Sequence, residues 1–152
     1  MPNLEQFDKQ KDSILSTIRV RGPSLPVQIA KVLGVSPIFA SAFLSELRAE
    51  NKLKISNMRV GSSPLYFIQG QEPMLENFVQ HLNQREREAF EHLRKNLVLE
   101  DSTQTPIMRV ALRAIRDFAV SVKVRINGES KLFWKHHLLD DSEIGRIISG
   151  RL

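Results

Sequence analysis

Three arginines, Arg109, Arg113 and Arg116, are the side chains whose spacing best suits binding chemistry. They are four and three residues apart, so on a helix from Pro106 to Phe118 they lie within about 60° of one another. A guanidinium group is planar and donates two parallel hydrogen bonds to a phosphate. The pattern therefore predicts a phosphate-binding helix face. The alternative is a solvated face whose cations pair with acidic residues of the preceding helix.

The segment that follows, residues 119–137, alternates apolar and polar residues and predicts a β-hairpin. A two-residue turn at Asn127-Gly128 would set Val124 opposite Lys131 and mix the two faces. A three-residue connection would set Val124 near Leu132 and keep the apolar residues together. We expect the three-residue connection.

On that register the outer face of the hairpin gathers cations around one aromatic ring. Such a surface suits nucleic acid, because the ring can stack on a base. Lysines on edge strands also serve to prevent aggregation between sheets, which is the alternative here. The residues concerned are Lys123, Arg125, Lys131 and Lys135, around Phe133.

Catalytic and metal-binding patterns are weak. Cysteine is absent, which excludes thiol nucleophiles and cysteine zinc sites. None of His81, His92, His136 and His137 has the i, i+4 spacing with a carboxylate that zinc hydrolases use. We therefore expect a protein that is not an enzyme and that carries no metal and no cofactor.

Charge favours a polyanionic partner. The chain has 22 Lys+Arg against 17 Asp+Glu, a net charge of +5 and a pI near 9.8. Residues 103–136 are the most basic segment, whereas residues 72–102 are acidic. No stretch approaches the roughly 20 apolar residues of a membrane helix, and no secretory signal is apparent. The expected location is the cytoplasm, in association with the nucleoid.

The first half of the sequence predicts three helices and a hairpin. Helical spacing ends at Gly22-Pro23, and Ser36-Pro37 can cap a third helix that runs to about Glu50. Residues 53–56 and 65–68 predict two short strands. With the segment 29–36 at its centre, this order resembles the winged helix-turn-helix superfamily of DNA-binding domains, of an archaeal type.

The resemblance covers roughly residues 4–70, and the helices and hairpin of the second half suggest another such unit, so we expect an α+β, mainly helical fold with two tandem domains. Residues 1–71 would form the winged helix-turn-helix domain. Residues 72–152 would form a second, reduced winged-helix-like domain with helices and the hairpin at 119–137.

In this superfamily the third helix enters the major groove of DNA. Its outward positions here are small or apolar, and one is cationic. The residues predicted to contact nucleic acid are Ser41, Ser45 and Arg48 on the helix, with Lys52, Lys54 and Arg59 on the turn and wing.

The resemblance implies a transcription regulator or a nucleoid or chromatin component. Its expected partner is double-stranded DNA, with RNA or single-stranded DNA as alternatives, and a homodimer is conceivable. A different class is an adaptor that docks on a replication, transcription or translation complex. The adaptor would use Ile38, Ala42 and Ala49 as its contact surface.

Overall fold

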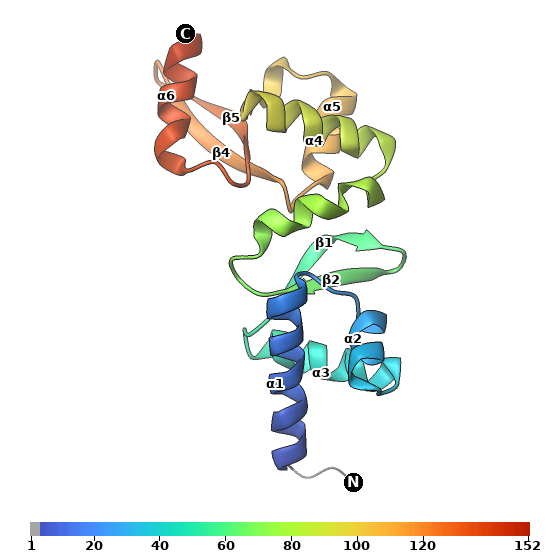
Figure 1. Cartoon of the computed structure of the whole chain (residues 1–152). Coiled ribbons are helices and arrows are strands. Elements are labelled where there is room, and N and C mark those ends of the chain that lie inside the picture. The colour runs from blue at the N-terminus through green and yellow to red at the C-terminus, as the bar shows by residue number, and fades with distance from the viewer. Residues whose placement is uncertain (1–3) are drawn as a thin grey trace. The chain divides into compact units, whose positions relative to one another are not determined.

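The structure is a computed structural model that describes residues 4–152. The chain divides into two compact units, Met1–Phe78 (unit 1) and Val79–Leu152 (unit 2). Figure 1 shows the order of their helices and strands. This division lies seven residues after the boundary that we placed between residues 71 and 72, within the segment Glu72–His81. The fold is α+β and mainly helical.

Unit 1 begins with three helices: α1 (Leu4–Arg21), α2 (Pro26–Leu33) and α3 (Pro37–Ala49). The turn between α2 and α3 uses Gly34 at φ 68°, in the left-handed region that glycine adopts without a steric penalty. The Ser36 hydroxyl then accepts a hydrogen bond from a backbone N–H in the first turn of α3, as predicted.

A hairpin, β1 (Lys54–Val60) and β2 (Ser63–Phe67), completes unit 1. It is longer than predicted, because the strands continue to the turn at Gly61-Ser62. An isolated bridge between Ser24 and Tyr66 gives β2 a second neighbour. The core beneath is formed by buried apolar residues of the three helices and the residue before β1: Ile14, Ile18, Ile29, Ala30, Ala40, Phe43, Leu44, Leu47 and Leu53.

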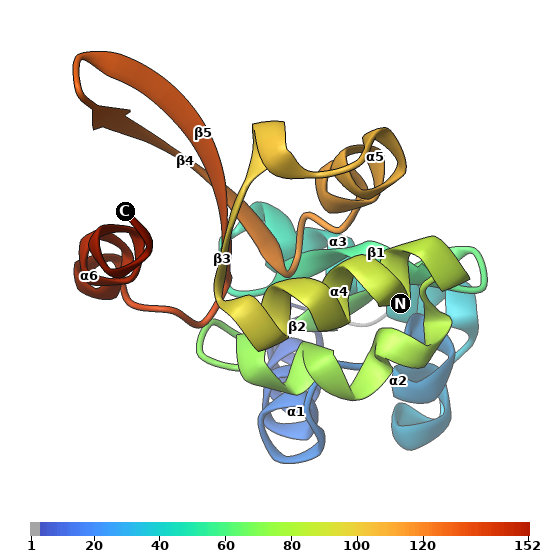
Figure 2. The same ribbon diagram turned by 90° about the horizontal axis from the view of Figure 1, so that it is seen from above.

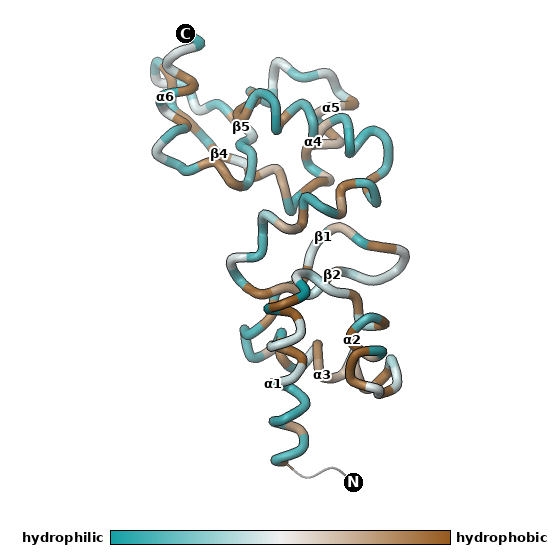
Figure 3. The backbone as a smooth tube through the Cα atoms, viewed as in Figure 1, coloured by the Kyte–Doolittle hydropathy of each residue, from teal (hydrophilic) through white to brown (hydrophobic). Residues whose placement is uncertain are grey.

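A 3-10 helix, η1 (Glu72–His81), leads to α4 (Gln84–Asn96), which is mostly hydrophilic along its length (Figure 3). Asn83 and Glu86 form a capping box, in which each side chain accepts a hydrogen bond from the other residue's backbone N–H. The chain leaves α4 through Leu97, whose φ is 68°.

The middle of unit 2 consists of β3 (Val98–Glu100), the 3-10 turn η2 (Asp101–Thr103) and α5 (Pro106–Ala114). Thr105 caps α5, since its hydroxyl accepts a hydrogen bond from the Met108 backbone N–H. However, α5 ends at Ala114 rather than continuing to residue 118. Residues 116–118 form a turn instead.

The hairpin of unit 2 pairs β4 (Ala119–Ile126) with β5 (Glu129–His136), and β3 lies on the other edge of β5. The register corrects our expectation. Ile126 pairs with Glu129 across a two-residue turn, so Val124 lies opposite Lys131. The cause is local: Asn127 and Gly128 have φ values of 52° and 83°, the positive pair that a type I′ turn requires.

The last helix, α6 (Asp141–Arg151), is capped by Asp140, whose carboxylate accepts a hydrogen bond from the Ser142 backbone N–H. It packs on one face of the sheet, where Ile144 and Ile148 join Val98 and Phe133 in a buried cluster. Near its end the Arg151 guanidinium donates to two backbone carbonyls at the junction of α4 and β3.

The order of elements in unit 2 is helix, strand, short turn of helix, helix and hairpin. This is a winged-helix-like order in which the second helix is reduced to η2, consistent with a second, reduced unit.

Across residues 4–152, no single helix is long and apolar enough to cross a membrane; α2 and α3 meet that criterion only as a pair, bent by 112°.

Candidate nucleic-acid interfaces

The exposed face of α3 is the first candidate surface. The positions predicted to point outward do so: Ser45, Arg48 and Ala49 are exposed, and Ser41 is half-buried. Arg48 makes no ion pair within residues 4–152. One cation and two hydroxyls are therefore available on this helix.

Lys11 of α1 partly neutralises two acidic residues at the C-terminal end of α3. Lys11 Nζ lies 3.3 Å from a Glu46 carboxylate oxygen and 3.0 Å from one of Glu50. The hydrogen bond to Glu50, aided by Glu46, raises the pKa of Lys11 against the opposing effect of burial. Lys11 thereby reduces the repulsion that these two carboxylates would exert on a phosphate.

The wing of unit 1 holds the other predicted cations. Lys52 is exposed, whereas Lys54 Nζ lies 3.3 Å from Glu72. The Arg59 guanidinium donates to the Ser62 carbonyl at 2.7 Å, which fixes it across the hairpin turn. All three lie at the surface, and Lys52 has no ion-pair partner in residues 4–152.

The same helix also exposes apolar surface. Ile38 is 82% exposed and Phe39 is 59% exposed. Phe39 borders, with Phe7 and Val35, a groove of about 550 Å³ on unit 1. Ala42 and Ala49, the other predicted adaptor contacts, are exposed as well.

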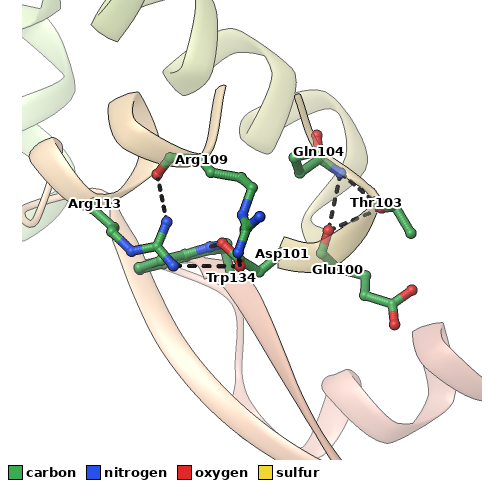
Figure 4. Close-up of polar contacts among 7 residues, drawn as sticks. All are labelled: Glu100, Asp101, Thr103, Gln104, Arg109, Arg113 and Trp134. Atoms are coloured by element: carbon green, nitrogen blue, oxygen red, sulfur yellow. Dashed lines mark hydrogen bonds and ion pairs between the residues drawn. The ribbon is translucent and has the colours of Figure 1, made fainter. Parts of the chain in front are cut away.

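In unit 2 a buried carboxylate organises two of the three predicted arginines (Figure 4). Asp101 accepts a hydrogen bond from the indole N–H of Trp134 at 2.9 Å. Its other oxygen lies 2.9 Å from Arg109 Nη2, 3.0 Å from Arg109 Nε and 3.4 Å from Arg113 Nη2. Arg113 also lies over the Trp134 ring, 5.8 Å from its centroid, and donates to the Arg109 carbonyl.

Burial alone raises the pKa of Asp101, since a charged carboxylate loses its hydration. The Trp134 hydrogen bond and the charges of Arg109 and Arg113 outweigh that effect, and the pKa of Asp101 falls below its usual value. The carboxylate is therefore charged at neutral pH. The side chains of Arg109 and Arg113 are still 43% and 47% exposed.

The third arginine is not part of this cluster. Because α5 ends at Ala114, Arg116 lies in the turn that follows and does not share a helix face with Arg109 and Arg113. Arg116 is exposed at that turn. The predicted row of three arginines on one helix is wrong.

The hairpin register also places the four predicted cations of the hairpin on two opposite faces rather than on one. Residues that pair across an antiparallel sheet share a face, and successive residues alternate. Lys123 pairs with Leu132 and Ser121 with Trp134, so Lys123 and Arg125 lie on the face of Trp134.

Lys131 and Lys135 lie on the opposite face with Phe133. Phe133 is only 6% exposed, so the predicted stacking of this ring on a base is wrong. Both lysines have acidic partners: Lys131 Nζ is 3.5 Å from Glu100, and Lys135 Nζ is 2.5 Å from Asp141. Figure 2 shows α6 on one side of the hairpin and α5 on the other.

Sequence reasoning missed Asp101 and Trp134. A tryptophan N–H usually finds an acceptor when the ring is buried, but nothing in the sequence names that acceptor. The sequence also gives no sign of an apolar surface on α5. In the structure Ile107 and Val110 are exposed, and they line a groove of about 440 Å³ between α5 and the start of α4.

Residues 10–70 match the model of a family described as FaeA-like protein, a winged helix-turn-helix family. The matched region contains the helix-turn-helix and the wing of unit 1. No curated protein matches the chain.

Proposed function

Because residues 10–70 match a winged helix-turn-helix family, we propose that this protein binds duplex DNA, as a transcription regulator or a nucleoid component. The observation that carries the proposal is this match to a regulator family over the segment that presents α3. We further propose that the two units act as tandem winged helices, that the protein is of archaeal type, that it is not an enzyme, and that it works in the cytoplasm.

Unit 1 contributes both kinds of contact in this proposal. The exposed Arg48 and Lys52 bind phosphates, which fix the position of the domain on the duplex. The hydroxyls of Ser41 and Ser45 are the polar groups of α3 that can reach base edges. With one cation on the helix, most of the affinity comes from the phosphate backbone, and sequence preference is modest.

The test is a titration of a labelled mixed-sequence duplex, followed by fluorescence anisotropy at about 50 and 200 mM salt. We expect a steep loss of affinity with salt. Arg48→Gln and Lys52→Gln each weaken binding and lower the salt slope by about one. Arg19→Gln removes an exposed arginine from α1 and serves as the charge-matched control. Absence of duplex binding at low salt would overturn the proposal.

The exposure of Ile38 and Phe39 favours a second candidate, the adaptor. Large apolar side chains at a solvent face are typical of protein contacts. If the protein binds neither DNA nor RNA at low salt, the adaptor is the better explanation. A pull-down with wild type and with Ile38→Asp tests it directly, because the adaptor requires a partner that the variant loses.

A further inference from the structure

We propose that unit 2 carries a phosphate-binding surface of its own, the hairpin cation row, formed by Arg113, Lys123 and Arg125 and oriented at its start by Asp101. The row extends the proposed DNA binding and rests on it. The ligand is the sugar-phosphate backbone of a duplex, bound without regard to sequence.

The sheet register places the three cations in sequence along one face. Arg113 lies over Trp134, whose partner in β4 is Ser121. Lys123 and Arg125 follow Ser121 at intervals of two residues on the same face, a spacing of about 7 Å per step. The row therefore extends over about 14 Å. Measured along the helix axis of DNA, this length contains about four phosphates of one strand.

Asp101 is a positioning residue in this surface. One carboxylate faces two guanidinium groups, so the cluster has a net positive charge. Each guanidinium has five N–H donors, and both side chains are nearly half exposed, so donors are left for a phosphate. The Asp101 carboxylate and the Trp134 ring hold Arg113 in place before the ligand arrives, which lowers the entropy cost of binding.

The opposite face of the hairpin lacks this excess of charge. Lys131 and Lys135 pair with Glu100 and Asp141, and Arg146 of α6 lies 3.6 Å from Glu143. Lys123, in contrast, makes no ion pair within residues 4–152. The free positive charge is therefore on the Trp134 side.

The exposed residues of α5 favour contacts with the phosphate backbone of DNA over recognition of base edges. This helix is in the place that the recognition helix has in a winged helix, yet it exposes Ile107 and Val110. These side chains have no donors or acceptors for base edges. The arginines and lysines of the row suit phosphates of any sequence.

The experiment uses the full-length chain and two unrelated duplex sequences. We expect Lys123→Gln and Arg125→Gln each to weaken binding to both duplexes by at least about threefold and to lower the salt slope by about 0.9. The matched controls are Lys131→Gln, from the same hairpin, and Arg146→Gln, and both keep the wild-type slope.

Asp101→Asn tests the positioning role through the sign of its effect. Removal of a carboxylate raises the net charge, so long-range electrostatics alone would strengthen DNA binding. Positioning predicts weaker binding. Trp134, the single tryptophan, reports by its fluorescence whether the variant keeps its fold.

If Asp101→Asn unfolds, the Lys123 and Arg125 variants still decide the proposal. Wild-type slopes in both of these variants, or equal losses in Lys131→Gln, would overturn the cation row while leaving duplex binding by unit 1 intact. A wild-type chain that does not bind duplex at low salt overturns the proposed function and the row together. Stronger binding by folded Asp101→Asn would overturn the positioning role.

Discussion

Replacement of Asp101 by alanine is the sharpest test of how unit 2 is held together. The side chain is 6% exposed and accepts hydrogen bonds from the Trp134 indole and from two arginines. Asp101→Ala removes the acceptor for a buried N–H and the counter-charge for two guanidinium groups. We expect a large loss of stability in unit 2.

The magnitude follows from the exposure of the partners. Trp134 is 7% exposed, so its N–H stays buried without an acceptor, which costs about 1–3 kcal/mol. Arg109 and Arg113 are nearly half exposed, so water replaces the carboxylate and each ion pair contributes about 0–1 kcal/mol. The expected loss is the sum of these contributions, about 1–5 kcal/mol. Asp101→Asn keeps an acceptor for the indole and loses less.

The two units have separate optical reporters for this measurement. The single tryptophan, Trp134, is in unit 2, and the single tyrosine, Tyr66, is in unit 1. Urea unfolding followed at Trp134 gives the free energy of unfolding of unit 2. Glu129→Gln, at an exposed site beside the hairpin turn, is the control for loss of one carboxylate. An Asp101→Ala variant within about 0.5 kcal/mol of wild type would refute the reasoning.

Three further predictions concern unit 2. Acidification lowers the free energy of unfolding of unit 2, because the fold lowers the pKa of Asp101. The stability that the Asp101 carboxylate contributes is present above about pH 4 and is lost as the pH falls below that value. In urea titrations across pH, Asp101→Asn flattens this dependence. Gly128→Ala costs about 1–2 kcal/mol by the same assay, because φ there is 83°, and a cost near zero would contradict the type I′ turn. Phe133→Ala costs about 3–5 kcal/mol, since the ring packs in the core beneath α6; a thermal midpoint equal to wild type would place the ring outside that core.

Local chemistry made the helix starts predictable. Ser36, Asn83, Thr105 and Asp140 each precede a helix, and each caps it with its side chain in the structure. A cap depends on a few neighbouring residues, so the sequence contains all the information. The end of α5 had no such signal, because Ile115 and Phe118 are buried beyond it and continue the apolar pattern.

The hairpin faces could not be predicted from alternation. Alternation indicates the register only when each strand has one buried face, but Phe133 and Trp134 are adjacent, lie on opposite faces, and are both buried. Helix α6 covers the first residue, whereas the second lies against Asp101 and Arg113. When other elements of the fold cover both faces of a hairpin, the alternation of polar and apolar residues no longer indicates the strand register. The register is then set by the two-residue Asn-Gly turn.

The contact from Arg151 has a consequence for the order in which unit 2 is assembled during synthesis. The carbonyls that it holds, at Asn96 and Val98, leave the ribosome long before α6 does. Strand β3 is likewise unpaired until β5, its pairing partner, has been synthesised. The corner between α4 and β3 is therefore synthesised early and is completed only by α6, the last helix. A nascent chain that ends before residue 129 lacks β5 as well, and β3 then has no pairing partner.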